Sequence, residues 1–406
     1  MRRFATVLVL GVLLVGLVAC GASSGPKPST TAAQAARYPA PATSAAAAGA
    51  SCRQVATKEL ADVARRVYAQ AVHGGGVVSA VTRLQRNPAL ATAVAGGRRG
   101  AVAAAFLPLR HQIIRIELFD RTHRVYSYGR KPSFAPVRGD LYDAGGRVVG
   151  HFILAATDQR AYAGLMQRLA GADTVFRTGT RAAATRKGFH TTTLATHAYP
   201  SGPMHIDVQI PTPPSSLCGT GSADTRLRTI GFVGRRVLAA EGNSRAVDQT
   251  LRFAASNPAF RAATAAGDPA AIRAVIVREF FGDHSHHIVR VRVTRGSQLI
   301  YDLGGPYVLQ PATGTVRSPD GRTSATFTLA VQDDTGYIKL MHRFTGAAVQ
   351  LTSPVGRVPG STLTPGPDQI PDHGPVTYGG RRYLADSYTG TAFPSGTLRI
   401  SLLIPA

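Results

Sequence analysis

The sequence contains no Trp, only three Cys, and few acidic side chains, with 22 Asp and Glu against 46 Lys and Arg. So few carboxylates give no support for a glycosidase with paired carboxylates. Outside the low-complexity stretch at residues 21–27, the chain also lacks the patterns of a G-x-S-x-G elbow, an H-E-x-x-H helix, an S-x-x-K stretch and a phosphate-binding glycine loop. We therefore expect a protein that is not an enzyme and has no cofactor.

The amino terminus has the pattern of a secretory signal. Arg2 and Arg3 precede an uncharged apolar run over residues 4–18, and small residues follow it. The run is shorter than the roughly 20 residues that a membrane-spanning helix needs. We predict that residues 1–19 are a signal peptide and that the protein is exported.

The end of this segment, Leu17-Val18-Ala19-Cys20, resembles the lipobox of bacterial lipoproteins. The resemblance implies that Cys20 receives a diacylglyceryl group, that the chain is cut before it, and that a fatty acid such as palmitate acylates the new amino group. Two or more acyl chains hold a protein stably. Membrane lipid would then anchor the chain through Cys20 on the extracytoplasmic face of the cell membrane. The alternative is an ordinary secreted protein with a chance cysteine near its cleavage site.

Export also bears on the partners of this basic chain, whose formal net charge is +24. Such a charge often indicates nucleic-acid binding, but an exported protein rarely meets nucleic acid, and we expect none. A basic exterior favours anionic headgroups or an anionic envelope polymer. A solvated basic surface with no partner remains the alternative.

Residues 20–50 are mainly Ala, Ser, Thr, Pro and Gly, which cannot bury enough surface to fold. We predict a disordered tether there. If Cys20 carries lipid, the remaining thiols are Cys52 and Cys218, and an oxidising location permits a disulfide between them. Two free thiols are the alternative.

The rest of the chain contains an internal repeat. Arg65-Arg66-Val67 recurs as Arg235-Arg236-Val237, at a spacing of 170 residues that later becomes 175, where Tyr162 matches Tyr337. We predict two domains of one fold, residues 51–211 and 225–406, joined by a linker at 212–224.

Each repeat predicts helices followed by strands, an α+β class. Apolar spacing near three and four predicts long helices over 55–86 and 225–256, and shorter ones over 89–107 and 259–280. Period-two alternation and turn residues predict strands. The expected strands are 114–118, 123–128, 148–156, 190–197 and 204–210, then 289–293, 298–303, 324–331, 381–388 and 397–404.

This order, a long helix, a short helix and then one antiparallel sheet, resembles the extracellular Cache domain, a PAS-like sensor module. The resemblance covers nearly all of residues 51–406 as two copies, and is carried by 114–126, 141–150 and Tyr162, then by 289–301, 320–322 and Tyr337. It implies a small extracellular ligand, such as an amino acid or a carboxylate, bound against the sheet. We expect no signalling module of its own, so the protein would act through a membrane receptor or simply hold the ligand.

Candidate ligand residues lie on the strands that line a Cache pocket. Arginine can grip a carboxylate bidentately and tyrosine supplies a flat wall. The candidates are Arg115, Tyr126 and Tyr128 in the first repeat and Arg290, Arg292 and Tyr301 in the second. The alternative is that these arginines point to solvent.

A histidine cluster, His284, His286 and His287, is a weaker candidate for zinc or copper. A solvated loop is the better interpretation. Two functions remain open: a tethered ligand-binding protein, and a structural or envelope-contacting surface lipoprotein without a pocket.

Overall fold

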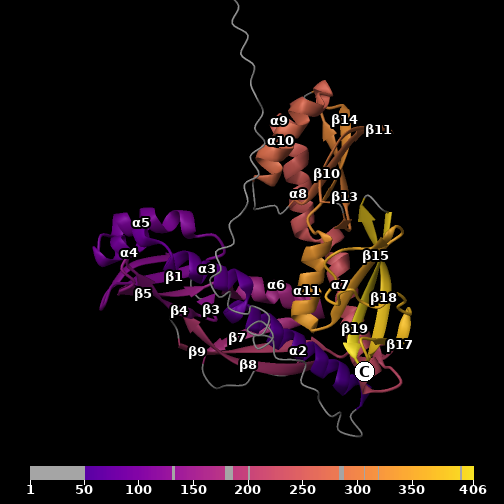
Figure 1. Cartoon of the computed structure of the whole chain (residues 1–406), viewed down its shortest axis with the longest axis horizontal. Coiled ribbons are helices and arrows are strands. Elements are labelled where there is room, and N and C mark those ends of the chain that lie inside the picture. The colour runs from indigo at the N-terminus through magenta and orange to yellow at the C-terminus, as the bar shows by residue number, and fades with distance from the viewer. Residues whose placement is uncertain are drawn as a thin grey trace, which may run out of the picture. The chain divides into compact units, whose positions relative to one another are not determined.

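The computed structural model describes residues 51–129, 133–178, 186–199, 202–282, 288–305, 307–318, 320–393 and 396–406 (Figure 1). Three predictions lie outside these residues: the signal peptide, the lipidated Cys20 with its tether, and the histidine cluster at 283–287. Among the described residues, no helix is both long and apolar enough to cross a bilayer.

The first half of the described chain begins with helices and continues with strands. The helices are α2 (Cys52–His73), α3 (Gly75–Gln85), α4 (Pro88–Ala95), α5 (Arg99–Phe106) and, later, α6 (Gln159–Ala170). The strands are β1 (Arg115–Phe119), β2 (Arg124–Gly129), β3 (Ser133–Phe134), β4 (Val137–Tyr142), β5 (Val148–Ala155), β6 (Thr157–Asp158), β7 (Asp173–Thr178), β8 (Phe189–Tyr199) and β9 (Gly202–Pro211).

The second half has the same order. Its helices are α7 (Ser222–Asn243), α8 (Arg245–Ser256), α9 (Pro258–Ala266), α10 (Pro269–Val275) and α11 (Asp334–Thr345). Its strands are β10 (Arg290–Arg295), β11 (Gln298–Gly304), β12 (Val308–Leu309), β13 (Ala312–Arg317), β14 (Thr323–Ala330), β15 (Ala348–Ser353), β16 (Gly356–Arg357), β17 (His373–Tyr378), β18 (Arg381–Phe393) and β19 (Gly396–Pro405).

Side-chain caps and helix-breaking residues set the helix ends. Ser51 begins α2 with a capping box, and Asn87 and Asn257 accept hydrogen bonds at the starts of α4 and α9. Each predicted long helix is interrupted once, at Gly74 and at Ser244, where the backbone is extended. The interruption at Gly74 falls in a run of glycines, which favour helix poorly.

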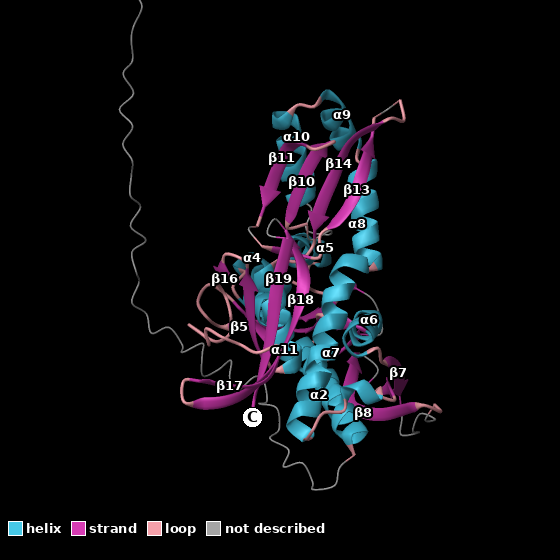
Figure 2. Ribbon diagram, turned by 90° about the vertical axis from the view of Figure 1, so that its right-hand side faces the viewer, coloured by secondary structure: helices cyan, strands magenta, loops and turns pink. Residues whose placement is uncertain are grey.

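Each half contains two antiparallel sheets, so the prediction of one sheet per repeat was wrong. The four-stranded sheets have the orders β2-β1-β5-β4 and β11-β10-β14-β13, which correspond strand for strand. The other two have the orders β6-β3-β8-β9-β7 and β12-β18-β19-β15-β16, with β17 added to β18. Figure 2 shows both sheets of the second half, with α8, α9 and α10 beside the four-stranded one. The predicted α+β class with antiparallel sheets is confirmed.

The long helices α2 and α7 pack against each other, and one hydrophobic core contains residues of both halves. In each half, one of the repeated tyrosines joins the later helix, α6 or α11, to the long helix at the start of that half. Tyr162 donates to the carbonyl of Ala64 at 3.1 Å, and Tyr337 donates to that of Gly234 at 3.0 Å. Residues 40–406 form one compact unit. The assignment of two separate domains therefore stays a prediction.

The second arginine of the repeated motif reaches across to the other half. Arg236 on α7 donates to the carbonyls of Gln167 and Arg168 at the end of α6, at 2.7 and 3.3 Å. Arg66 on α2 lies against Gly346, which ends α11, so that a Cβ built there would be 2.9 Å from Nη2. A guanidinium at a helix carboxyl terminus meets unpaired carbonyls and a favourable dipole. In both repeats the motif thus places its second arginine at the end of a helix of the other half, and Arg236 binds carbonyls there.

Candidate functional site

The structure separates Arg115 from the two tyrosines with which it was grouped. Tyr126 and Tyr128 lie on the side of the sheet that faces α5, where their rings pack against Phe106 with centroids 5.8 and 5.3 Å apart. Arg115 and Glu117 lie on the opposite side, because successive side chains of a strand alternate. These residues do not line one site.

In the second half, Arg290 and Arg292 lie together on the same outer side. Both guanidiniums bind Asp302, with the two Nη2 atoms 2.8 and 2.7 Å from Oδ2. Both also lie over the ring of Phe393, at 4.9 and 4.0 Å. Tyr301 is on the other side, packed against the hydrophobic core. Burial alone raises the pKa of Asp302, but the hydrogen bonds from the two arginines outweigh it and hold that pKa below its usual value.

Arg115 forms the matching cluster in the first half. It is completely buried, binds Glu117, and lies 5.2 Å from the ring of Tyr199. The Tyr199 hydroxyl donates to Glu117, and Arg124 lies 3.3 Å from the same carboxylate. Within the described residues, Nε and Nη1 of Arg115 have no hydrogen-bond partner.

The two clusters place the acid differently. Glu117 occupies the position of Arg292, whereas Asp302 occupies that of Ser127 on the neighbouring strand. In both halves the acid already pairs with an arginine that was expected to meet a ligand, although in the first half it binds Arg115 through Nη2 alone. Ligand binding by these residues stays a prediction, and a second place in the chain offers a better-formed site.

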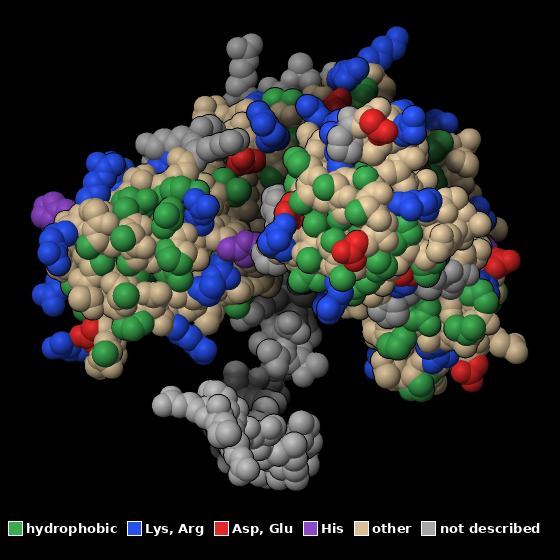
Figure 3. Space-filling view, turned by 90° about the horizontal axis from the view of Figure 1, so that it is seen from above, with side chains coloured by type: hydrophobic (Ala, Val, Ile, Leu, Met, Phe, Trp, Pro, Cys, Tyr) green, Lys and Arg blue, Asp and Glu red, His purple; other side chains and the backbone are tan. Residues whose placement is uncertain are grey.

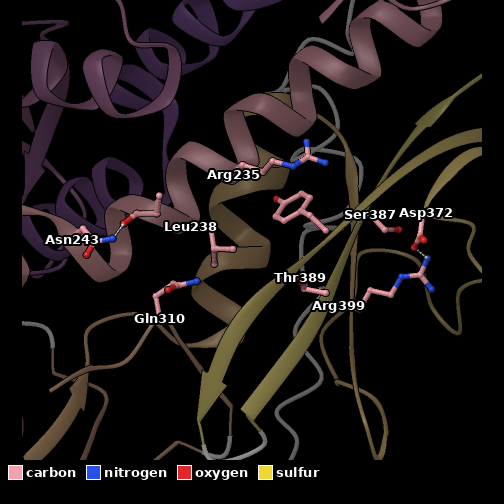
Figure 4. Close-up of a pocket in the computed structure, with 10 residues that line it drawn as sticks. Arg235, Leu238, Asn243, Gln310, Asp372, Ser387, Thr389 and Arg399 are labelled. Carbon is pink, nitrogen blue, oxygen red and sulfur yellow. Dashed lines mark hydrogen bonds and ion pairs between the residues drawn. The ribbon is translucent and has the colours of Figure 1, made fainter. Parts of the chain in front are cut away.

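An open pocket of about 610 Å³ lies beside β18 (Figure 4). Helix α7 forms one wall and the strands β18 and β19 form another. The lining residues are Arg235, Leu238, Ala239, Asn243, Gln310, Asp372, Ser387, Tyr388, Thr389 and Arg399.

The pocket borders a gap in the pairing of β18. Strand β17 pairs with residues 381–386 and β12 pairs with residues 392–393 of the same edge. Between these two pairings, the N–H of Ser387 donates to the carbonyl of Asp372, and the N–H of Gln310 donates to that of Thr391. Every second residue of β18, counted from Ser387, therefore points its backbone N–H and C=O outward, away from β19. Thr389 is one of these residues. For the part of the chain that the structure describes, its outward N–H and C=O have no partner.

Two arginines flank this gap from different elements. Arg235 on α7 is 47 % exposed and lies 3.0 Å from Asp386. Arg399 on β19 is 38 % exposed and binds Asp372 at 2.7 Å, while Asp372 itself is 92 % exposed. Such a solvated pair contributes little stability. A ligand carboxylate could therefore replace Asp372 beside Arg399 at small cost.

Tyr388 forms the fixed side of the pocket. Its hydroxyl lies 2.6 Å from that of Tyr337, and the guanidinium of Arg235 lies 4.7 Å from its ring. Burial is the main cause that raises the pKa of Tyr388 above its usual value, so the phenol stays neutral. A neutral wall leaves Arg235 and Arg399 as the positive groups facing a ligand.

A search of family models, curated proteins and solved structures found no match to this chain. Among the residues that the structure describes, no group of three His, Cys, Asp or Glu side chains could hold a metal ion. The geometry of the pocket is therefore the main guide to function.

Sequence reasoning missed this pocket, although one signal was present. Arg235 belongs to the repeated Arg-Arg-Val motif, which marked it as structurally special. Arg399 and Thr389 had no such mark. A gap between two edge strands depends on distant pairings, which no local pattern encodes.

Proposed function

We propose that this chain is an exported, lipid-anchored binding protein whose pocket beside β18 takes a small ligand bearing a carboxylate, such as an amino acid or an organic acid. The observation that carries the proposal is that Arg235, Arg399 and Thr389, whose outward backbone groups are free within the described residues, all line one open pocket. A carboxylate accepts well from a guanidinium and a backbone N–H together.

The fold agrees with a Cache-like sensor module at a coarse level. Each half begins with a long helix and continues with antiparallel strands, which supports the resemblance, although the second sheet in each half goes beyond it. We propose binding, not catalysis, with any signal passed to a membrane receptor. Acylation of Cys20 would be tested by metabolic labelling with a fatty-acid analogue, and label retained by Cys20→Ala would reject it.

The experiment is a thermal-shift screen of organic acids and amino acids, followed by calorimetry with any hit. A ligand at 100 times its Kd stabilises the native state by about 2.7 kcal/mol. Arg399→Gln should weaken binding about tenfold or more, since a hydrogen bond to a charged group contributes about 1.5–3 kcal/mol.

A second variant tests the strand edge itself. Thr389→Pro removes the outward N–H, and proline is tolerated at an edge whose N–H has no strand partner. It should weaken binding while the fold persists. Arg381→Gln, an exposed arginine of the same strand outside the pocket, is the matched control. Equal binding by all three variants, or no stabilisation by any acid, would reject the proposal in favour of a structural surface lipoprotein.

A further inference from the structure

The helices α4 and α5 belong to a stretch without acidic side chains. Residues 63–116 contain eight Arg and no Asp or Glu. Four of these arginines are exposed and have no acidic partner within the described residues: Arg86, Arg98, Arg99 and Arg110. Some exposed arginines elsewhere have an acidic partner, as Arg147 has Asp143 at 2.8 Å, but it is the absence of any Asp or Glu from the whole stretch that sets these four apart.

The same helices enclose a shallow groove of about 580 Å³ with an apolar floor. Its lining residues are Pro88, Ala89, Thr92, Ala93, Gly96, Arg98, Ala101, Ala104 and Ala105. Leu107 follows Ala104 by three residues, hence on the same side, and is 50 % exposed. Of the four arginines, Arg98 lines the groove, and Arg86, Arg99 and Arg110 are exposed at the ends of the helices around it. We name these four arginines, the groove and Leu107 the α4–α5 face.

Figure 3 shows hydrophobic side chains on the left-hand body, ringed by Lys and Arg with few Asp or Glu. This body is the side on which Figure 1 places α4 and α5. Exposed apolar side chains bordered by unpaired cations match the interfacial layer of an anionic bilayer, where headgroups meet acyl chains.

The second half provides an internal comparison. At the positions equivalent to Arg86, Arg98 and Arg99 it has Ser256, Asp268 and Pro269, a change from three positive charges to one negative. Asp268 caps α10 by accepting from the N–H of Ala270 at 2.8 Å. Arg98 begins α5 without a side-chain cap, although a cation is unfavourable at a helix amino terminus. Arg98 therefore makes the start of α5 less stable than an aspartate at the same position would.

We propose that the α4–α5 face docks on an anionic phospholipid surface. The inference is independent of the pocket beside β18 and of acylation at Cys20. The arginines meet the headgroup phosphates, and Leu107 with the alanine-lined groove meets the boundary of the acyl chains.

The test uses residues 40–406, the compact unit, so that neither acyl chain nor signal peptide contributes. Co-sedimentation compares phosphatidylcholine vesicles with vesicles in which about a third of the lipid is phosphatidylglycerol. We expect binding to the anionic vesicles only, weakened by salt. The triple variant Arg86→Gln/Arg98→Gln/Arg99→Gln should bind about a hundredfold more weakly, at about fivefold for each arginine.

Two further variants keep the result interpretable. Arg245→Gln/Arg252→Gln/Arg273→Gln removes the same charge from exposed positions of α8 and α10 and should bind like the wild type. Arg98→Asp restores the cap of the second half, so it should raise thermal stability while it lowers vesicle binding. Arg399→Gln should keep vesicle binding, which separates this proposal from the ligand proposal.

The proposal is overturned if the wild type does not bind the anionic vesicles. Binding to a soluble anionic polymer without binding to these vesicles would overturn it as well. Equal losses in the two triple variants would also overturn it, because the effect would then follow net charge and not this face.

Discussion

Glu117 is the buried acid around which the polar side chains of the first four-stranded sheet are arranged. Burial alone raises its pKa, but the donors from Tyr199 and Arg115 outweigh burial and hold the pKa below its usual value. The pKa of Tyr199 is raised to about 12, by burial first and by Glu117 second. The phenol therefore remains a donor across the whole range in which Glu117 titrates.

This arrangement predicts a loss of stability in acid. The unfolded-state pKa of Glu is about 4.3, and the folded-state value of Glu117 is lower, so its contribution is complete above the unfolded value. The contribution is lost as the pH falls through the folded value. Between about pH 5 and pH 3, the free energy of unfolding should fall less in Glu117→Gln than in the wild type.

Urea unfolding at each pH measures this difference. Tyr199→Phe removes one donor and should give an intermediate slope. Tyr301→Phe removes a phenol hydroxyl from the second half and serves as the control. Parallel curves for the wild type and Glu117→Gln would contradict the prediction.

At the scale of the elements, the periodicity of the sequence predicts where strands lie better than it predicts how they pair into sheets. The alternation of 114–118 and 289–293 matches β1 and β10, because each has one side against the core. Strands β4 and β13 were missed, since each contains a glycine and polar side chains that weaken the pattern. The division into two sheets was missed because the second sheet depends on pairings between strands far apart in the sequence, such as β3 with β8.

Those two glycines are required by the repeated phenylalanines. Gly139 lies opposite Phe152, and Gly314 lies opposite Phe327. A Cβ at Gly139 would be 2.4 Å from Cζ of Phe152, and one at Gly314 would be 2.5 Å from Cζ of Phe327. Both rings are fully buried and cannot move aside. The phenylalanine ring on β5 thus covers the backbone of β4, and the one on β14 covers the backbone of β13.

Gly139→Ala should therefore lower the free energy of unfolding by about 1–3 kcal/mol, the usual cost of overpacking a core. The added Phe152→Leu change should recover part of that loss if the ring is the cause. Gly164→Ala on α6 is the control, since a Cβ there meets nothing within 4 Å and should stabilise the helix by about 1 kcal/mol. Denaturant unfolding gives all three values, and a neutral Gly139→Ala would contradict the packing argument.

At the scale of the whole molecule, a shared hydrophobic core and several side-chain contacts connect the two halves. Side chains cross between them in both directions: Arg236 of the second half binds the end of α6, and Arg168 of the first half lies 3.8 Å from Glu241 on α7. The sequence predicted the cysteine pairing, because Cys52 and Cys218 each precede one repeat. It could not predict that Arg66 and Arg236 each reach a helix end of the other half, because such an arginine and an exposed one look alike in a sequence.

The structure places Cys52 and Cys218 as a disulfide-compatible pair, with Cα atoms 5.3 Å apart and a sequence separation of 166. The bond would close a loop that contains nearly the whole first half and join the start of α2 to the segment before α7. A cross-link of this kind limits the unfolded chain, an effect of about 2–5 kcal/mol. Cys52→Ser/Cys218→Ser in residues 40–406 should lose that much in urea unfolding, and reductant should destabilise the wild type equally but leave the variant unchanged. Two free thiols titrated in the oxidised native protein would contradict the pairing, and would leave the side-chain contacts and the shared core to hold the halves together.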